Sequence, residues 1–120
     1  MGKTVRDVIK DRVGTTYVPT FNAPTATVGT TAAVLLTQNP SRVAFQIVNL
    51  GAFDIFVTPN GVPSATRGIR IAANGGTATA FWEEDGETTA WEWAAVAIGG
   101  ASAVFVQEIL IARPDAETPP

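Results

Sequence analysis

The densest group of side chains that could do chemistry is the acidic run Glu83-Glu84-Asp85-Gly86-Glu87. Carboxylate oxygens in a turn are ligands that Ca²⁺ accepts. The spacing matches neither an EF-hand nor another calcium-binding loop, and consecutive carboxylates on an extended tip point in different directions. We therefore interpret the run as the solvated tip of a hairpin, and we expect no metal ion and no cofactor.

The other candidates for catalysis lack the partners that they would need. Glu92 and Glu108 could in principle serve as paired carboxylates in glycoside hydrolysis, but nothing in the sequence places either one in a buried setting. The chain contains no His and no Cys. It therefore lacks the usual general base, a His-activated serine, a thiolate metal site and disulfide bonds. We expect no enzymatic activity.

Three tryptophans, Trp82, Trp91 and Trp93, admit two interpretations. Large aromatic faces can stack on sugar rings, and they are equally what a small hydrophobic core uses. Trp91 and Trp93 alternate with Glu92, which puts both rings on one face of a strand. We interpret the three tryptophans as core residues or as part of an oligomer interface.

The elements that would position these groups are strands. Apolar residues alternate along Arg42–Asn49 and again along 52–58, with the turn signal Asn49-Leu50-Gly51 between them. This pattern predicts a β-hairpin, in which Arg42 and Asp54 form a cross-strand ion pair if they share a face. Similar patterns predict strands at 31–37, 68–71, 77–82, 91–97 and 103–112. The predicted fold is all-β: an antiparallel β-sandwich or barrel of jelly-roll type, with about seven or eight strands.

Composition divides the 120 residues into three parts. Residues 1–30 are expected to form an N-terminal arm and linker, 31–112 the β domain, and 113–120 a flexible tail. Helical spacing over 4–13 predicts a short helix, and Pro19 and Pro24 restrict the linker to extended segments or an edge strand.

Charge follows the same division. Residues 1–12 carry four basic and two acidic side chains, and the remainder carries four Arg against nine carboxylates, which gives the net charge of −3. A basic arm on an acidic body indicates either an interaction arm or a solvated helix, and the acidic body argues against nucleic-acid binding. No apolar run predicts a signal peptide or a membrane span. The residues expected to make contacts from the arm are Lys3, Arg6, Lys10, Arg12, Tyr17 and Phe21.

One longer pattern resembles a motif of small virion proteins of tailed bacteriophages, over roughly residues 31–110. The pattern is Arg42-x-x-x-x-Ile47-x-Asn49-x-Gly51, Ile55-x-Val57, Gly68-Ile69-x-Ile71-x-x-x-Gly75-Gly76, Trp93-x-Ala95-x-Ala97 and Val104-x-Val106-x-Glu108. These are mainly strand and turn positions, so the resemblance implies a compact β domain attached to the virion and carries over no set of functional residues.

The resemblance implies a capsid decoration or cement protein, made in the host cytoplasm and located on the capsid surface. Its partners would be the major capsid protein and other copies of this chain, with a homotrimer favoured. The alternative is a head-fibre or spike component that binds a host glycan through loops 59–67 and 83–89.

Overall fold

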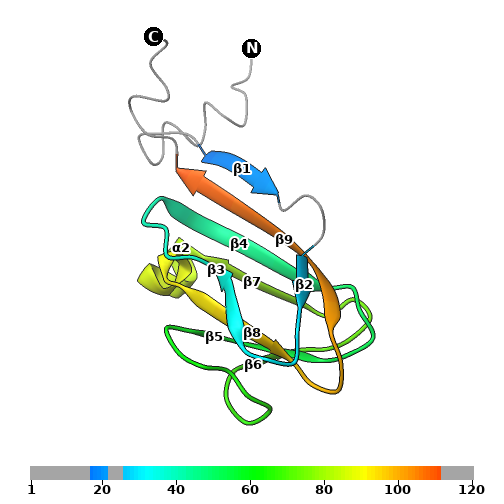
Figure 1. The fold of residues 1–120 in the computed structure, drawn as a ribbon. Helices are drawn as coiled ribbons and strands as arrows, with labels where there is room; N and C mark the ends of the chain where they lie inside the picture. The colour runs from blue at the N-terminus through cyan, green and yellow to red at the C-terminus, as the bar shows by residue number, and fades with distance from the viewer. Residues whose placement is uncertain (1–16, 22–25, 112–120) are drawn as a thin grey trace, which may run out of the picture.

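The computed structural model describes residues 17–21 and 26–111. Within them, nine strands form two antiparallel sheets (Figure 1). The strands are β1 (Tyr17–Phe21), β2 (Ala26–Val28), β3 (Ala33–Leu36), β4 (Arg42–Asn49), β5 (Ile55–Pro59), β6 (Ile69–Ile71), β7 (Thr77–Phe81), β8 (Trp93–Ala97) and β9 (Ser102–Ile111). A short helix, α2 (Trp82–Asp85), and a 3₁₀ turn, η1 (Gly86–Ala90), connect β7 to β8. No helix in this part of the chain is long and apolar enough to cross a membrane.

The order of the strands is that of a jelly roll. One sheet runs β1–β9–β4–β7, with β2 also beside β9, and the other runs β3–β8–β5–β6 (Figure 1). From β2 onward, every connection passes from one sheet to the other except the link between β5 and β6. The fold class predicted from the sequence is therefore confirmed. Two strands, β1 and β2, pair with successive stretches of β9 and share one position in the sheet.

The predicted hairpin of β4 and β5 is wrong, although both strands exist. β4 pairs with β7 and β9 in one sheet, and β5 pairs with β6 and β8 in the other. The segment between them, residues 50–54, crosses the sandwich instead of reversing the chain within a sheet. Alternation of apolar residues shows which face of a strand is buried, but it does not show which strand lies beside it.

The β domain begins before residue 31, where the sequence analysis placed its start, because β1 and β2 both pair with β9. β1 forms the edge of its sheet, so the expectation that Pro19 is restricted to an extended segment or an edge strand is met. β9 is central, with β4 on one side and β1 and β2 on the other. The predicted helix of residues 4–13 and the tail at 113–120 lie outside the described residues.

The core lies between the two sheets. Its largest fully buried side chains are aliphatic: Ile47, Val104 and Val106 from one sheet, and Ile55, Val57 and Ile71 from the other. Across the middle, the rings of Phe45 and Trp93 meet edge to face with their centroids 5.0 Å apart. Burial of these side chains is the main stabilising contribution to the fold.

Candidate functional site

Asn49, at the end of β4, holds together segments from both sheets. Its side chain is completely buried. The Nδ2 group donates hydrogen bonds to the carbonyl oxygens of Phe53 (2.8 Å) and Ile71 (3.0 Å). The Oδ1 atom accepts hydrogen bonds from Ser102 Oγ (2.6 Å) and the backbone N–H of Gly51 (3.2 Å). A buried amide that is fully hydrogen-bonded in this way favours one arrangement of the chain over its alternatives.

The glycines of the motif fit closely around Asn49. The backbone N–H of Asn49 donates to the carbonyl of Gly76 (2.8 Å), and the N–H of Gly75 donates to the carbonyl of Asn49 (2.7 Å). Gly75 has a φ of 112°, which favours glycine. A Cβ on Gly51 would clash with Ser102 Oγ and lie 2.8 Å from the backbone nitrogen of Ala103. This part of the motif is therefore explained by chain packing.

Arg42, at the other end of β4, is a second buried polar centre. Its Nε donates to the carbonyl of Thr89 (2.9 Å), and its Nη2 donates to the carbonyl of Trp91 (2.6 Å). Its Nη1 donates to the carbonyl of Thr37 (2.9 Å) and forms an ion pair with Glu108 at 2.7 Å. The Arg42 side chain has no exposed surface. Since its guanidinium is engaged on all sides, its task is to fix the neighbouring segments.

The ion pair expected between Arg42 and Asp54 does not exist, because Arg42 begins β4 and Asp54 lies at the far end of the crossing segment, just before β5 in the other sheet. Asp54 instead accepts hydrogen bonds from the backbone N–H of Ala73 (2.9 Å) and from Arg70 Nε (3.0 Å), which lie near the end of β6. The hydrogen bond from Ala73, and then the one from Arg70, hold the pKa of Asp54 below its ordinary value.

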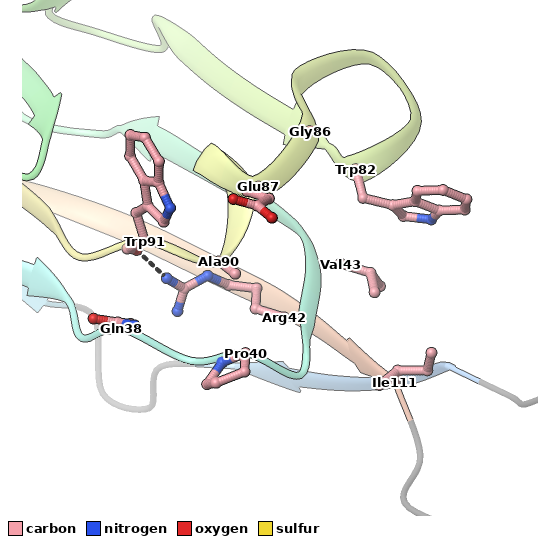
Figure 2. A pocket seen from close by; sticks show the side chains of 10 residues that line it. All are labelled: Gln38, Pro40, Arg42, Val43, Trp82, Gly86, Glu87, Ala90, Trp91 and Ile111. Atoms are coloured by element: carbon pink, nitrogen blue, oxygen red, sulfur yellow. Dashed lines mark hydrogen bonds between the residues drawn. The ribbon is translucent and has the colours of Figure 1, made fainter.

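A pocket of about 730 Å³ lies at the Arg42 end of the sandwich. Its walls come from residues 38–43, from the segment 82–91 and from Ile111 (Figure 2). Trp82 and Trp91 lie on opposite sides of Glu87, and Gln38 lies on the facing wall. Pockets that hold small ligands have volumes of roughly 300–1,000 Å³, mostly apolar walls and a few polar groups. This pocket fits that description.

The segment that builds one wall of the pocket is held in place by hydrogen bonds. Arg42 binds the carbonyls of Thr89 and Trp91, on either side of Ala90. The carbonyl of Ala90 itself accepts a hydrogen bond from the N–H of Asn39 (2.9 Å). Three successive carbonyls of the segment are therefore bound to other parts of the domain, so this part of the wall is held in place by the protein itself.

Val43 also lines the pocket, although it alternates along β4 with Phe45 and Ile47, which belong to the core. The register between β4 and β9 shifts between Arg42 and Ala44. An irregularity of this kind re-aims side chains. Accordingly, Phe45 and Ile47 belong to the core cluster and Val43 does not.

The three tryptophans have different environments. Trp93 is in the core, 6% exposed, and its Nε1 donates to the carbonyl of Thr88 (2.9 Å). Trp91 is half-buried and lines the pocket, and Trp82 is 39% exposed at its rim. Of the two predicted roles, core residue or oligomer interface, Trp93 has the first, Trp82 lies outside the core cluster, and an interface role for Trp82 and Trp91 stays a prediction. The rings of Trp82 and Phe81 are tilted neighbours, with centroids 6.0 Å apart.

The acidic run forms α2 and η1, and the predicted hairpin tip is wrong. Asp85 Oδ2 accepts a hydrogen bond from the backbone N–H of Phe81 (2.8 Å), and acidic residues in a first helical turn are favourable. Gly86, with a φ of 64°, ends the helix. The acidic run is exposed to solvent, as expected. Among the described residues, no group of three or more acidic side chains is positioned to hold a metal ion.

The residues proposed for the arm are only partly described. Lys3, Arg6, Lys10 and Arg12 lie outside the described residues. Tyr17 and Phe21 begin and end β1, where they pair with Ile111 and Gln107 of β9. The backbone at these two positions is thus part of the sandwich.

Comparisons with known proteins bear on the fold. No protein-family model matches the sequence, and no curated protein matches it. One solved structure, from "Bacillus endospore appendages form a novel family of disulfide-linked pili", superposes with a TM-score of 0.50 at 18% sequence identity. The alignment covers 82% of this chain and 89% of that chain. At this identity the likeness concerns the fold alone.

Proposed function

We propose that this chain is a structural protein of a bacteriophage virion that decorates or cements the capsid by binding across neighbouring major capsid subunits. In this proposal it has no catalytic role and assembles as a homotrimer. The buried polar residues of its motif, Arg42 and Asn49, stabilise the domain, and its contacts are made by surfaces.

The observation that carries the proposal is exposed apolar surface at the Asn49 end of the sandwich. Leu50, Phe53 and Ile98 are 52%, 39% and 41% exposed. The N–H of Ile98 donates to the carbonyl of Asp54 (3.0 Å), next to Phe53, and the N–H of Leu50 donates to the carbonyl of Ala103 (2.8 Å), so all three residues come from segments at this end of the sandwich. We call these three residues the apolar end patch. Clustered apolar side chains in water are typical of a protein–protein contact.

The structural neighbour gives limited support. That protein is described as forming disulfide-linked pili, so a fold of this kind occurs in an assembly. The present chain has no cysteine. Any assembly that it forms must depend on non-covalent contacts, which makes the apolar end patch and the N-terminal arm the first places to test.

Two measurements test the proposal: the oligomeric state by light scattering, and binding by co-sedimentation with capsids of the bacteriophage that encodes the chain. The wild-type chain is expected to be a trimer that sediments with capsids. The double variant Leu50→Ser, Ile98→Ser is expected to lose one or both properties, while Val62→Ser, which changes a residue that is 68% exposed elsewhere, keeps them. A wild-type chain that is a monomer and stays in the supernatant would contradict the proposal.

Removal of residues 1–14 tests the arm separately. We expect the truncated chain to retain its β-sheet circular dichroism and to lose attachment to capsids. If it still sediments with capsids, the arm is not the contact. Electron microscopy of intact particles would distinguish a decoration protein from a component of a spike or tail.

A second candidate function, binding of a host glycan by a head-fibre or spike component, is favoured by the pocket. Of the two loops expected to bind glycan, 83–89 contributes Gly86 and Glu87 to the pocket, and 59–67 contributes no lining residue. Screening on a glycan array tests this candidate, and saturable binding is the expected result.

A further inference from the structure

We infer that the pocket at the Arg42 end binds a neutral saccharide, with Trp82 and Trp91 as stacking surfaces and Glu87 and Gln38 as hydrogen-bonding groups. This inference deepens the second candidate function and depends on it. It names the pocket as the site and restricts the glycan to a neutral saccharide.

The walls of the pocket match the chemistry of a sugar. A pyranose ring has an apolar face of C–H groups, which packs on an aromatic ring, and hydroxyl groups at its edge, which need hydrogen-bond partners. Trp82 and Trp91 provide indole rings, the carboxylate of Glu87 accepts hydrogen bonds, and the amide of Gln38 both donates and accepts them. Glu87 and Gln38 are both exposed. Neither side chain makes a hydrogen bond or ion pair with the rest of the described residues, so both can serve a ligand.

The charges of the described lining residues disfavour an anionic ligand. Among the residues that the structure describes, the one basic side chain in the lining is Arg42, and its guanidinium is fully buried and already bound to three carbonyls and to Glu108. The carboxylate of Glu87 and the neighbouring acidic residues of α2 would repel a phosphate, a sulfate or an acidic sugar.

The arrangement of the two tryptophans argues against a compact cation. A cage for a quaternary ammonium needs aromatic faces gathered around one point. Here Trp82 and Trp91 lie on opposite sides of Glu87 (Figure 2), so a small ion could not contact both. An extended ligand of two or more rings could contact both, and a volume of about 730 Å³ leaves room for it.

The tryptophans also provide the assay. Each indole N–H gives its own signal in a ¹H–¹⁵N NMR spectrum of the full chain. Titration with neutral oligosaccharides, namely cellobiose, maltotriose, N,N′-diacetylchitobiose and a mannobiose, is expected to shift the signals of Trp82 and Trp91 for at least one probe. The signal of Trp93 should stay in place, since its Nε1 is bound to the carbonyl of Thr88 in the core.

Two variants and one control assign the binding to the pocket. Trp82→Ala removes an exposed ring outside the core, so the domain should remain folded. The affinity for the saccharide should fall about tenfold or more, because one stacking contact is lost. Glu87→Gln should also weaken binding, whereas Glu84→Gln, in the same acidic run but outside the pocket lining, should not.

Three results would overturn the inference. One is that none of the four oligosaccharides shifts Trp82 or Trp91 at about 10 mM, a concentration that detects even millimolar affinity. Another is that choline or a uronic-acid oligosaccharide shifts them and the neutral sugars do not. The third is that the chain binds a glycan on the array and Trp82→Ala binds it equally well. That last result would leave the glycan-binding function standing and reject this pocket as its site.

Discussion

Replacing Asn49 with alanine should destabilise the domain strongly, although the residue lies at the end of a strand. The side chain makes four hydrogen bonds, and those to the carbonyl of Ile71 and to Ser102 Oγ are buried. An unsatisfied buried donor or acceptor costs about 1–3 kcal/mol, so these two partners alone give a loss of about 2–6 kcal/mol. The partners at Phe53 and Gly51 are only partly buried and can be hydrated, so we do not count them.

Guanidinium denaturation followed by tryptophan fluorescence measures this loss. Trp93 is buried in the core and reports on unfolding. A domain of this size has a total stability of about 5–15 kcal/mol, so the midpoint for Asn49→Ala should shift clearly while the slope m stays constant. At about 4 °C per kcal/mol for a domain of this size, the corresponding fall in Tm is roughly 8–24 °C. Gln46→Ala is the matched control, since Gln46 is a half-buried amide in the same strand and makes no side-chain hydrogen bond to the described residues.

Asn49→Asp tests hydrogen bonding at nearly unchanged side-chain shape, because a carboxylate replaces the amide. One oxygen of the introduced carboxylate can still accept the hydrogen bonds from Ser102 Oγ and the N–H of Gly51. The other oxygen faces the carbonyl oxygens of Phe53 and Ile71, which repel it. The position is completely buried. Burial raises the pKa of such a carboxyl in the folded state. Its destabilising effect should therefore decrease as the pH falls from 7 to 5. A cost below about 1 kcal/mol for Asn49→Ala, or a pH-independent cost for Asn49→Asp, would refute the reasoning.

Three further predictions concern single groups. The Oγ1 of Thr89 is buried without a hydrogen-bond partner among the described residues, so Thr89→Val should raise the unfolding free energy by about 1 kcal/mol in denaturant titrations. Gly51→Ala should lower Tm sharply because its Cβ would meet backbone atoms, whereas Gly29→Ala, with open space around it, should leave Tm nearly unchanged in calorimetry. The pKa of Asp54 is below its ordinary value of 3.8, so its stabilisation is present above that value and is lost as the pH falls through the lower folded pKa. Asp54→Asn should therefore flatten the acid end of a plot of unfolding free energy against pH, and an unchanged acid end would contradict the assignment.

The strands could be predicted from the sequence, and their partners could not. The alternation in Arg42–Asn49 and in 52–58 correctly indicated two strands. Asn49 and Gly51 looked like the turn of a hairpin because both residues favour turns. In the structure, these two residues lie where the chain crosses from one sheet to the other. The side chain of Asn49 is hydrogen-bonded to Ile71 and Ser102, which lie far away in the sequence. Long-range hydrogen bonds of this kind leave no local pattern.

The pocket was beyond prediction for a related reason. Its walls come from residues 38–43, 82–91 and 111, and what brings the first two together is the hydrogen bonding of Arg42 to main-chain carbonyls. Any residue has a carbonyl, so no spacing of side chains could indicate these contacts. Trp82 was interpreted as a core residue or as part of an oligomer interface because of its large aromatic ring. Its position in a four-residue helix, too short to give a periodic signal, puts it in solvent.

The two candidate functions are located at opposite ends of the same strand, and this makes them separable. β4 runs from Arg42 beside the pocket to Asn49 beside the apolar end patch, a length of roughly 23 Å at the rise of an extended chain. Substitutions more than about 10 Å apart without shared partners act independently. A chain with Leu50 and Ile98 replaced by serine should therefore retain any saccharide binding at Trp82, and Trp82→Ala should retain assembly. A subunit built in this way could use one end for contact with its neighbours and present the other to a ligand.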